Sequence, residues 1–341
     1  MEVKKLISRI VEDSSPIEEE ESHTVACMMI DGKMNDIQIA TALTALKMRG
    51  ETPDILFGFT KALTERVSKF HLGDAELIDT CGTGGDGKNT FNISTISSFV
   101  LAGGGVRVAK HGNRSITSNC GSADLLLGLG IDINLPPERA IEAIYEVGIG
   151  FLFAPLFHTA MKNVMRPRRE LGFKTLFNVV GPLSNPVGVK RQIIGVFSED
   201  LLMKVVRVLE RKGAIHCLVF HGLDGTDEIS ISGETRVYEL KDGKIKTFTI
   251  VPEELGIRRV PLEVVKGGDV ERNTNIALDV LSGEKSPYRD SVLLNSGAGF
   301  YVAGKASSIA EGIKLAEEAI DSGAALNKVR KLAEFTRRYV S

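Results

Sequence analysis

The chain has 341 residues, of which 43% are hydrophobic and 25% are charged, and its formal net charge is -2. This composition is that of a globular protein and excludes a largely disordered chain. A near-neutral net charge argues against a protein that mainly neutralises a nucleic-acid backbone, because such proteins are usually basic. We therefore expect no nucleic-acid partner.

Nothing in the chain predicts a membrane protein or a secreted one. No apolar run approaches the ~20 residues of a membrane-spanning helix, and the mixed-charge N-terminal segment lacks a run long enough for a signal peptide. The cysteines have no CxxC spacing and no paired histidine ligands; they are Cys27, Cys81, Cys120 and Cys217. They are typical of reduced thiols and not of a disulfide framework or a zinc site. We expect a cytoplasmic protein with no membrane partner.

Residues 1–72 show only helical patterns. Ser15-Pro16 followed by four glutamates is typical of a helix start, with a capping hydroxyl, proline in the first turn and acids near the positive end of the dipole. Asn35-Asp36 predicts the start of another helix, which ends at Gly50, and Pro53 predicts the start of the next. These residues predict a small helical domain.

From residue 76 onward, short apolar runs alternate with helical stretches. The runs are Glu76–Asp79, Val106–Ala109, Gly150–Phe153, Ile193–Val196 and Cys217–Phe220. The helical stretches include Ile93–Ala102, Pro137–Val147 and Asp200–Lys212. A tighter alternation over 229–250 predicts a hairpin with its turn at Asp242-Gly243, and the tail from Ser291 is helical again.

This order of elements predicts an α/β fold with two domains. The first is a small all-helical N-terminal domain, residues 1–72, and the second is a larger α/β domain, residues 73–341. The larger domain should contain a central, mostly parallel sheet surrounded by helices. Ligands of such sheets bind beyond the carboxyl ends of the strands, so functional residues are expected there.

A glycine loop, Gly82-Thr83-Gly84-Gly85-Asp86, follows the first predicted strand. Glycines let consecutive amides converge on phosphate oxygens, and a helix starting near Asn92 adds the positive end of its dipole. A dinucleotide site is disfavoured because Lys110-His111 stands where an acid should bind the ribose. A Walker loop is disfavoured because Asn89 replaces the magnesium-binding Ser or Thr. The favoured interpretation is a diphosphate held together with a metal ion.

The loop after the second predicted strand adds two cations, Lys110 and Arg114. Ser122, at the expected start of the next helix, offers a hydroxyl and free amides that suit a phosphate. A core histidine with a backbone partner remains an alternative for His111. From the residues alone, an ordinary acidic loop is an equal alternative to a metal site for Asp227-Glu228.

Five segments, in order and over nearly the whole chain, resemble the anthranilate phosphoribosyltransferase family. They are Gly82–Asp86 with Asn92, Ser94 and Thr95; Lys110–Arg114; Arg168–Gly172; Phe177–Pro186; and Asp227-Glu228. The resemblance implies transfer of the phosphoribosyl group of phosphoribosyl pyrophosphate (PRPP) to the amine of anthranilate, in tryptophan biosynthesis. The products would be N-(5'-phosphoribosyl)anthranilate and pyrophosphate.

The resemblance also implies site residues and an assembly. PRPP is expected to contact Gly82, Gly84, Gly85, Asp86, Thr90, Asn92, Ser94, Thr95, Lys110 and Ser122. Anthranilate is expected to contact Gly82, His111, Asn113, Arg168, Gly181 and Pro182. Two magnesium ions are expected, with Ser94, Asp227 and Glu228 as protein ligands. No general base is expected; Lys110, Asp227 and Glu228 would stabilise the leaving pyrophosphate.

A homodimer is expected through the helical domain, completed by helices from about 155–185. An apolar segment in the second helical stretch predicts the dimer face, unless it packs within the domain; it comprises Val25, Cys27, Met28, Met29 and Ile30. The sequence departs from the family at Asn119-Cys120, where Lys-Ser is expected, at Phe157, where tyrosine is usual, and in the run His158–Met161.

Two other functions fit the same fold. A pyrimidine nucleoside phosphorylase would bind phosphate and a nucleoside, with no need for Asp227-Glu228 or a carboxylate-binding Arg168. A non-catalytic relative that binds nucleic acid would show a degraded glycine loop and added surface cations, neither of which this chain has.

Overall fold

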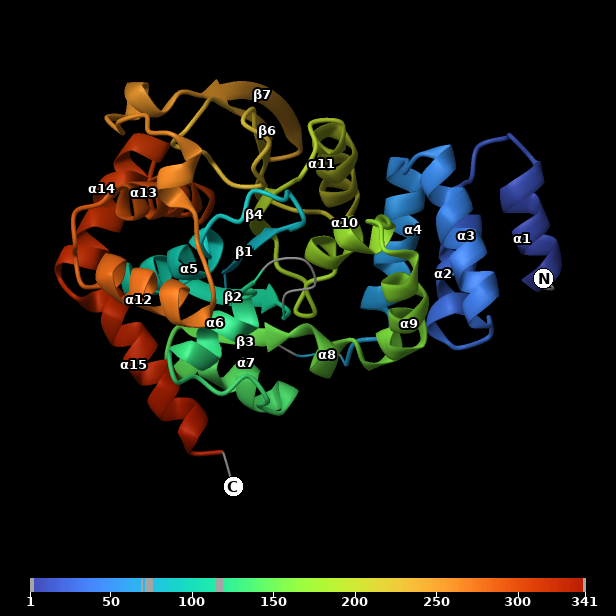
Figure 1. Cartoon of the computed structure of the whole chain (residues 1–341), viewed down its shortest axis with the longest axis horizontal. Helices are drawn as coiled ribbons and strands as arrows, with labels where there is room; N and C mark the ends of the chain where they lie inside the picture. Colours follow the sequence, from blue (N-terminus) through green and yellow to red (C-terminus); the bar gives the residue numbers. More distant parts are fainter. Residues whose placement is uncertain (1–2, 69, 71–75, 115–118, 340–341) are drawn as a thin grey trace.

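The computed structural model of the chain describes residues 3–68, 70, 76–114 and 119–339. A helical domain lies beside a larger α/β domain (Figure 1). The helical domain begins with four helices: α1 (Val3–Glu12), α2 (Glu19–Ile30), α3 (Asp36–Arg49) and α4 (Pro53–Thr64). Among the described segments, no helix is both long and apolar enough to cross a lipid bilayer.

Local capping sets the ends of α3 and α4. The side chain of Asn35 accepts from the Gln38 amide, and the side chain of Gln38 accepts from the Asn35 amide, which closes a capping box. α3 ends at Gly50, whose φ of 83° favours glycine. Thr52 caps α4, and Pro53 lies in its first turn. These ends confirm the predicted boundaries of both helices.

The predicted helix start at Ser15-Pro16 is wrong. α2 begins at Glu19, and its N-cap residue makes no side-chain hydrogen bond. The Ser15 amide donates instead to the Asp13 carboxylate at 2.8 Å, and the Pro16 carbonyl accepts from Arg9 of α1 at 2.9 Å. These contacts hold the segment against the end of α1, so it forms a connection and not a helical turn.

Within the described residues, seven strands form one sheet, in the order β3-β2-β1-β4-β5-β6-β7. They are β1 (Leu77–Gly82), β2 (Arg107–Gly112), β3 (Ile149–Phe153), β4 (Arg191–Gly195), β5 (His216–Gly222), β6 (Thr235–Lys241) and β7 (Lys244–Ile250). The neighbours from β3 to β5 pair in parallel, and β6 pairs antiparallel with both β5 and β7. Asp242 and Gly243 turn the last hairpin with φ of 49° and 72°. The predicted mostly parallel sheet is confirmed.

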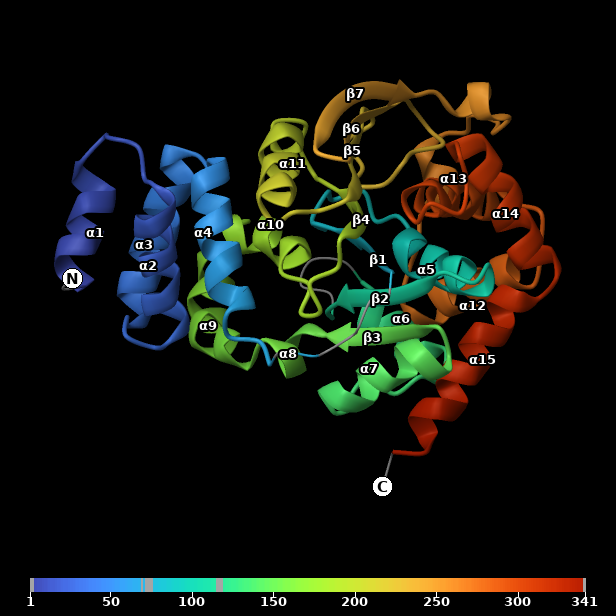
Figure 2. The same ribbon diagram turned by 180° about the vertical axis from the view of Figure 1, so that it is seen from behind.

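Helices lie around this sheet in both views (Figures 1 and 2). They are α5 (Ile93–Gly103), α6 (Ser122–Gly128), α7 (Pro137–Glu146), α8 (Ala154–Phe157), α9 (Lys162–Leu171), α10 (Leu176–Leu183), α11 (Leu201–Arg211), α12 (Val270–Leu281), α13 (Pro287–Val302), α14 (Ile309–Asp321) and α15 (Ala324–Arg337). Short 3-10 turns span Thr159–Met161, Pro252–Leu255 and Leu262–Val265. The sequence pattern does not predict α12.

Alternate residues of β5 point into two separate hydrophobic cores. Leu218 and Phe220 belong to the core shared with α5 and α13, whereas Cys217 and Val219 belong to a second core. The second core also contains residues of α1 to α4, α9, α10 and α11. Helices from the middle of the chain therefore pack with the N-terminal helices, and together they cover part of one sheet face.

The predicted dimer face in α2 is wrong. Val25, Met29 and Ile30 are fully buried, and Cys27 and Met28 pack partly buried against the second core. This segment packs within its own chain because its apolar side faces α4 and the neighbouring helices.

Candidate active site

The glycine loop leaves β1 at the carboxyl edge of the sheet. Gly84, Gly85 and Gly87 have φ of 64°, 73° and 72°, which side-chain-bearing residues rarely adopt. The Thr83 amide donates to the Gly195 carbonyl at 2.9 Å. The Thr83 hydroxyl accepts from the Phe197 amide at 3.1 Å. The loop is therefore anchored to the end of β4.

The loop after β5 brings two acids to the glycine loop. Oδ2 of Asp227 accepts from the Gly84 amide at 2.7 Å. Oε1 of Glu228 accepts from the Ser94 amide at 3.3 Å, at the start of α5. The Asp227 amide lies 3.4 Å from Oδ2 of Asp86. The expected metal ligands Ser94, Asp227 and Glu228 thus lie together beside the expected phosphate loop.

Crowding and burial perturb these carboxyl groups. Burial, and then the charge of Asp86, raises the pKa of Asp227 to about 7. Burial, and then the charge of Asp227, raises the pKa of Glu228 well above its usual range, although the Lys110 ammonium opposes this shift. A divalent cation would relieve this repulsion, and a set of oxygen ligands suits magnesium. The residues present therefore fit the expected metal.

Glycines at the ends of β1, β4 and β5 make room for these acids. A Cβ on Gly82, the last residue of β1, would lie 2.6 Å from Oδ2 of Asp227. A Cβ on Gly195, the last residue of β4, would lie 1.6 Å from the Asp227 carbonyl oxygen. A Cβ on Gly222, the last residue of β5, would lie 2.3 Å from the Thr226 hydroxyl. The acid loop can reach the glycine loop only because these positions lack side chains.

Lys110 lies inside β2 with 2% of its surface exposed. Its ammonium donates to the carbonyl of Thr80 and lies 3.4 Å from the hydroxyl of that residue. The same hydroxyl donates to the Ser94 carbonyl at 2.9 Å. Lys110 is therefore engaged beneath the site, and its charge acts on the carboxyl group of Glu228.

The start of α5 faces the start of α6. The hydroxyls of Thr95 and Ser122 are hydrogen-bonded at 3.1 Å. Asn92 donates to the Cys120 carbonyl at 3.0 Å and accepts from Asn273 at 2.9 Å. Both polar atoms of the Asn92 side chain therefore hold the loops in place, whereas the two hydroxyls lie where a phosphate was expected.

Thr90 and Asn113 lie at the edges of this group. The backbone of Thr90 pairs with Lys266 in an isolated bridge, and the exposed Asn113 accepts from the Ala123 amide at 3.2 Å. Arg114, expected as a cation for the phosphates, instead pairs with a carboxylate of α6 at 3.0 Å. Ser115 to Ser118 lie outside the described residues.

Two buried imidazoles, those of His111 and His158, lie beside each other. His111 and His158 lie with their ring centroids 5.2 Å apart. Burial lowers the pKa of His111 well below its usual range and lowers the pKa of His158 to about 4, so both rings are neutral at pH 7. Nε2 of His111 and both ring nitrogens of His158 lack hydrogen-bond partners among the described residues. Such atoms are costly to bury unless a ligand or water pairs with them.

Arg168 lies in the last turn of α9. Its Cζ lies 5.2 Å from the ring centroid of Phe177 in α10, and burial lowers the pKa of the guanidinium to about 10. No carboxylate forms an ion pair with it within the described part of the chain. In α10, Pro182 is buried, and a Cβ on Gly181 would meet no atom within 4 Å. Open space therefore lies beside Gly181.

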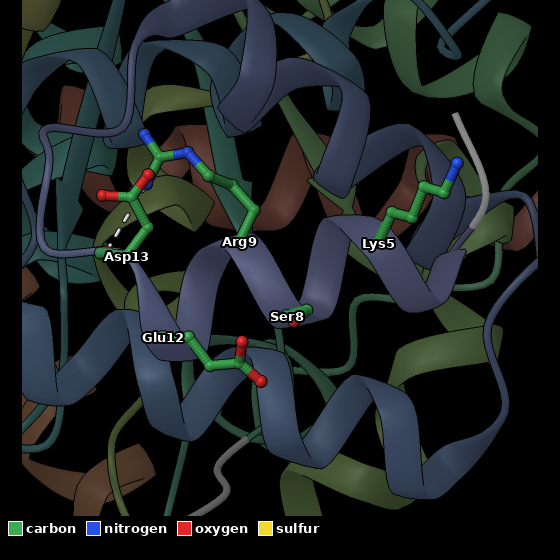
Figure 3. A pocket seen from close by; sticks show the side chains of 5 residues that line it. All are labelled: Lys5, Ser8, Arg9, Glu12 and Asp13. Atoms are coloured by element: carbon green, nitrogen blue, oxygen red, sulfur yellow. Dashed lines mark hydrogen bonds and ion pairs between the residues drawn. The ribbon is translucent and has the colours of Figure 1, made fainter.

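A surface depression lies in another part of the molecule. Residues of α1 and of the segment after it line this depression (Figure 3): Lys5, Ser8, Arg9, Glu12 and Asp13. It contains an Arg9–Asp13 ion pair of 3.3 Å and lies at the outer end of the helical domain (Figure 1). We assign it no role in the site.

Comparison with known proteins identifies the family. The glycosyl transferase family model for the a/b domain matches residues 74–326, and the model for its helical bundle domain matches residues 4–67. Anthranilate phosphoribosyltransferase from Persephonella marina is 45% identical over 98% of this chain and 99% of that protein. The protein of the same name from Acetivibrio thermocellus is 46% identical over 99% and 98%.

The chain belongs to the anthranilate phosphoribosyltransferase family. A crystal structure of the Thermus thermophilus member matches with a TM-score of 0.91 at 45% identity, over 99% of this chain and 100% of that one. The Saccharomyces cerevisiae member in complex with PRPP and Mg matches with a TM-score of 0.91 at 28% identity, over 98% of both chains.

The structure shows the surroundings of the residues at which this member of the anthranilate phosphoribosyltransferase family departs from the family pattern. Asn119 is exposed, whereas Cys120 is buried and its carbonyl accepts from Asn92. Phe157 is 5% exposed and packs edge-on against Phe70, with ring centroids 5.7 Å apart. A phenyl ring without a hydroxyl suits this apolar contact. The Thr159–Met161 segment forms a 3-10 turn.

Lys174 lies beside the glycine loop, and sequence reasoning did not single it out. It lies between α9 and α10, and a Cβ on Gly85 would be 2.9 Å from its Cε and 3.6 Å from its Nζ. Its ammonium lies 4.0 Å from the ring centroid of Phe197 and has no ion-pair partner among the described residues. Lys174 thus places an unpaired cation from the helical domain against the glycine loop. No local spacing distinguishes it from a surface lysine.

Asp79 was also missed, and it organises the floor of the site. This fully buried carboxylate of β1 accepts from the His111 amide at 3.1 Å, from Asn185 at 2.8 Å and from Gln192 at 3.3 Å. It joins β2, β4 and the segment after α10. Burial raises its pKa, and the charge of Lys110 opposes that shift.

Proposed function

We propose that this family member transfers the phosphoribosyl group of PRPP to the amine of anthranilate, giving N-(5'-phosphoribosyl)anthranilate and pyrophosphate, in tryptophan biosynthesis. The observation that supports this most directly is the junction of the glycine loop with Asp227 and Glu228. Backbone amides for phosphate oxygens and carboxylates for a divalent cation are the two needs of a diphosphate substrate.

The phosphoribosyl side of the site uses the edge of the sheet. The glycine-loop amides and the hydroxyls of Thr95 and Ser122 would bind phosphate oxygens, and Asp86 would accept from sugar hydroxyls. Ser94, Asp227 and Glu228 would hold magnesium, and three neighbouring carboxylates support a proposal of two ions. Bound magnesium would neutralise charge that develops on the leaving pyrophosphate.

The reaction breaks the bond between C1 of the ribose and the pyrophosphate oxygen and forms a bond from C1 to the amine nitrogen. Anthranilate's amine is uncharged at pH 7, so the site needs no strong base. The slow event is separation of pyrophosphate from an oxocarbenium-like sugar, which preorganised charges accelerate. Lys110 would balance the buried carboxylates from below, and Lys174 would approach the pyrophosphate from the helical domain.

The anthranilate side would lie beneath α10. Arg168 would pair with the carboxylate of anthranilate, because a guanidinium offers a planar fork of donors. The unpartnered Nε2 of His111 would meet a polar group of the substrate, and the open space beside Gly181 would take the ring. Asp79 fixes the backbone of His111 and, through Asn185, the end of α10.

We also propose a homodimer through the outer face of α3 and α9. Large apolar side chains are exposed there: Ile37 is 77% exposed, Met48 is 84% exposed and Met165 is 43% exposed. Light scattering should report a dimer that Ile37→Glu with Met48→Glu dissociates; a wild-type monomer at micromolar concentration would contradict this. A cytoplasmic location is part of the proposal, supported by Cys27, Cys81 and Cys217, which are thiols and not members of disulfides.

The proposed reaction and its main rival are separated by one substrate test. Loss of anthranilate fluorescence should require both PRPP and magnesium. Incubation with phosphate and thymidine or uridine should release no base. Release of base, with anthranilate unconsumed, would instead establish the nucleoside phosphorylase.

A further inference from the structure

Three side chains with metal-binding atoms meet in the helical domain, away from the glycine loop. His23 and Cys27 are four residues apart on α2, and Glu65 is the C-cap residue of α4. Nε2 of His23 lies 2.7 Å from Oε2 of Glu65 and 3.6 Å from Sγ of Cys27. One ligand atom from each residue lies within 4.8 Å of the other two.

These separations can be compared with those of a tetrahedral zinc shell. With zinc bonds of about 2.3 Å to sulfur and about 2.0–2.2 Å to nitrogen and oxygen, neighbouring ligand atoms are about 3.6 Å apart for S and N and about 3.4 Å for N and O. Sγ of Cys27 lies 3.6 Å from Nε2 and 3.8 Å from Nδ1 of His23, so the sulfur faces the imidazole ring, and the ring must turn about its side-chain bonds to share an ion with the thiol. The His23–Glu65 pair must open by less than about 1 Å to admit a metal.

The three residues are held by closely packed helices. Gly58 of α4 faces α2 so tightly that a Cβ there would lie 2.7 Å from the His23 amide nitrogen. The ligand atoms remain accessible, because the side chains of His23 and Glu65 are 25% and 46% exposed. An ion therefore reaches the three atoms from solvent without a change in the packing of α2 on α4.

A guanidinium lies beside the three ligand atoms. It belongs to Arg66, which follows Glu65 in the chain and lies next to the Cys27 thiol. Asp31 holds the same guanidinium with bonds of 2.6 Å and 2.8 Å, so its positive charge is already balanced. An ordinary surface ion pair would account for His23 and Glu65 but not for the thiol beside them.

We propose that His23, Cys27 and Glu65 bind one zinc ion, with water as the fourth ligand, and that the ion links α2 to the end of α4. Thiolate and imidazole ligands select zinc over magnesium, whereas the oxygen ligands at Asp227 and Glu228 favour magnesium. The two sites therefore select different metals. Cysteine spacing alone did not reveal this one because its ligands come from two helices and include only one thiol.

Cobalt titration tests the thiolate ligand directly. Addition of Co²⁺ to the full-length protein should produce a near-ultraviolet thiolate-to-cobalt absorption band that saturates at one equivalent and that Zn²⁺ abolishes. Cys27→Ser should remove the band, and Cys81→Ser, which changes the thiol beside Asp227 and Glu228, should leave it. Absence of the band in the wild type, or its persistence in Cys27→Ser, would overturn the proposal.

Two further variants test the other ligands. His23→Gln and Glu65→Gln should each weaken Zn²⁺ binding, measured by competition with a chromophoric chelator, by about tenfold or more. Glu20→Gln, an exposed change on the same helix, should bind as the wild type does. Zn²⁺ should raise the Tm of the wild type but not that of Cys27→Ser, with equal Tm values in EDTA. Equal zinc affinity of all three Gln variants would refute the assignment.

Discussion

The backbone amide of Gly84 donates a 2.7 Å hydrogen bond to Oδ2 of Asp227. This contact joins the loop after β1 to the loop after β5, across the strand β4 that lies between them in the sheet. A peptide amide suited to phosphate is thus paired with a carboxylate suited to magnesium. The amide would bind a phosphate oxygen, and the carboxylate would bind the magnesium ion that accompanies it. The surrounding glycines leave the space that keeps these two groups aligned.

Gly195→Ala should disable the enzyme without unfolding it. The added Cβ would lie 1.6 Å from the Asp227 carbonyl oxygen, so the acid loop must move away from the glycine loop. A displacement of about 1 Å at a reacting centre costs roughly 100-fold in rate, and we expect a loss of kcat/KM of that order. Gly233→Ala, whose Cβ would meet its nearest neighbour at 3.6 Å, is the matched control. Equal kinetics for both variants would contradict the steric argument.

Arg168→Ala should raise the KM for anthranilate and leave the KM for PRPP nearly unchanged. A hydrogen bond to a charged group contributes about 1.5–3 kcal/mol, which corresponds to a roughly 10- to 100-fold increase. Arg168→Lys should recover only part of the loss, because an ammonium does not reproduce the planar fork. Arg169→Ala, an exposed neighbour, should behave as the wild type. If Arg169→Ala had the larger effect, the carboxylate partner would be misassigned.

Lys174→Met should weaken the binding of PRPP and not that of anthranilate, the reverse of the Arg168→Ala effect. Loss of a cation beside the glycine loop should raise the KM for PRPP by about tenfold, since charged hydrogen bonds contribute at least about 1.5 kcal/mol, while the KM for anthranilate changes little. Initial rates with each substrate varied in turn measure both constants. Lys162→Met, an exposed change in α9, serves as the control. An unchanged KM for PRPP would show that Lys174 only packs against Phe197.

The buried His158 should make the protein less stable in acid. Its pKa falls from 6.5 to about 4 on folding, so the unfolded state binds more protons between these values. Stability is therefore complete above pH 6.5 and declines as pH falls toward 4, by roughly 3 kcal/mol from this residue. Urea unfolding at several pH values should show a smaller acid loss for His158→Phe. An identical pH dependence in that variant would exclude this origin.

Local features were predictable from the sequence because neighbouring residues determine them. Asn35 and Thr52 cap their own helices, and apolar runs predicted the strands that end in Gly82 and Gly222. The helix start predicted at Ser15-Pro16 was wrong because a tertiary contact with Arg9 competes with the local capping pattern.

Long-range relationships were not predictable in the same way. The function of Gly195 depends on a carbonyl in another loop, and the position of Lys174 depends on the packing of α9 and α10 within the helical domain. Asn92 lies where the motif placed it, but its side chain bonds to Cys120 and Asn273, which no spacing indicates. The position of the glycine loop at the end of a strand could thus be predicted from the sequence, whereas the residues that support the loop could not.

The most direct test of the account is the magnesium dependence of transfer from PRPP to anthranilate in Asp227→Asn and Glu228→Gln. Both substitutions nearly preserve side-chain size and remove a carboxylate that would hold the metal. We expect each variant to require higher magnesium concentrations and to lose roughly 100-fold or more in kcat, the scale of a lost electrostatic contribution to catalysis. Wild-type rates and wild-type magnesium dependence in both variants would contradict the central claim.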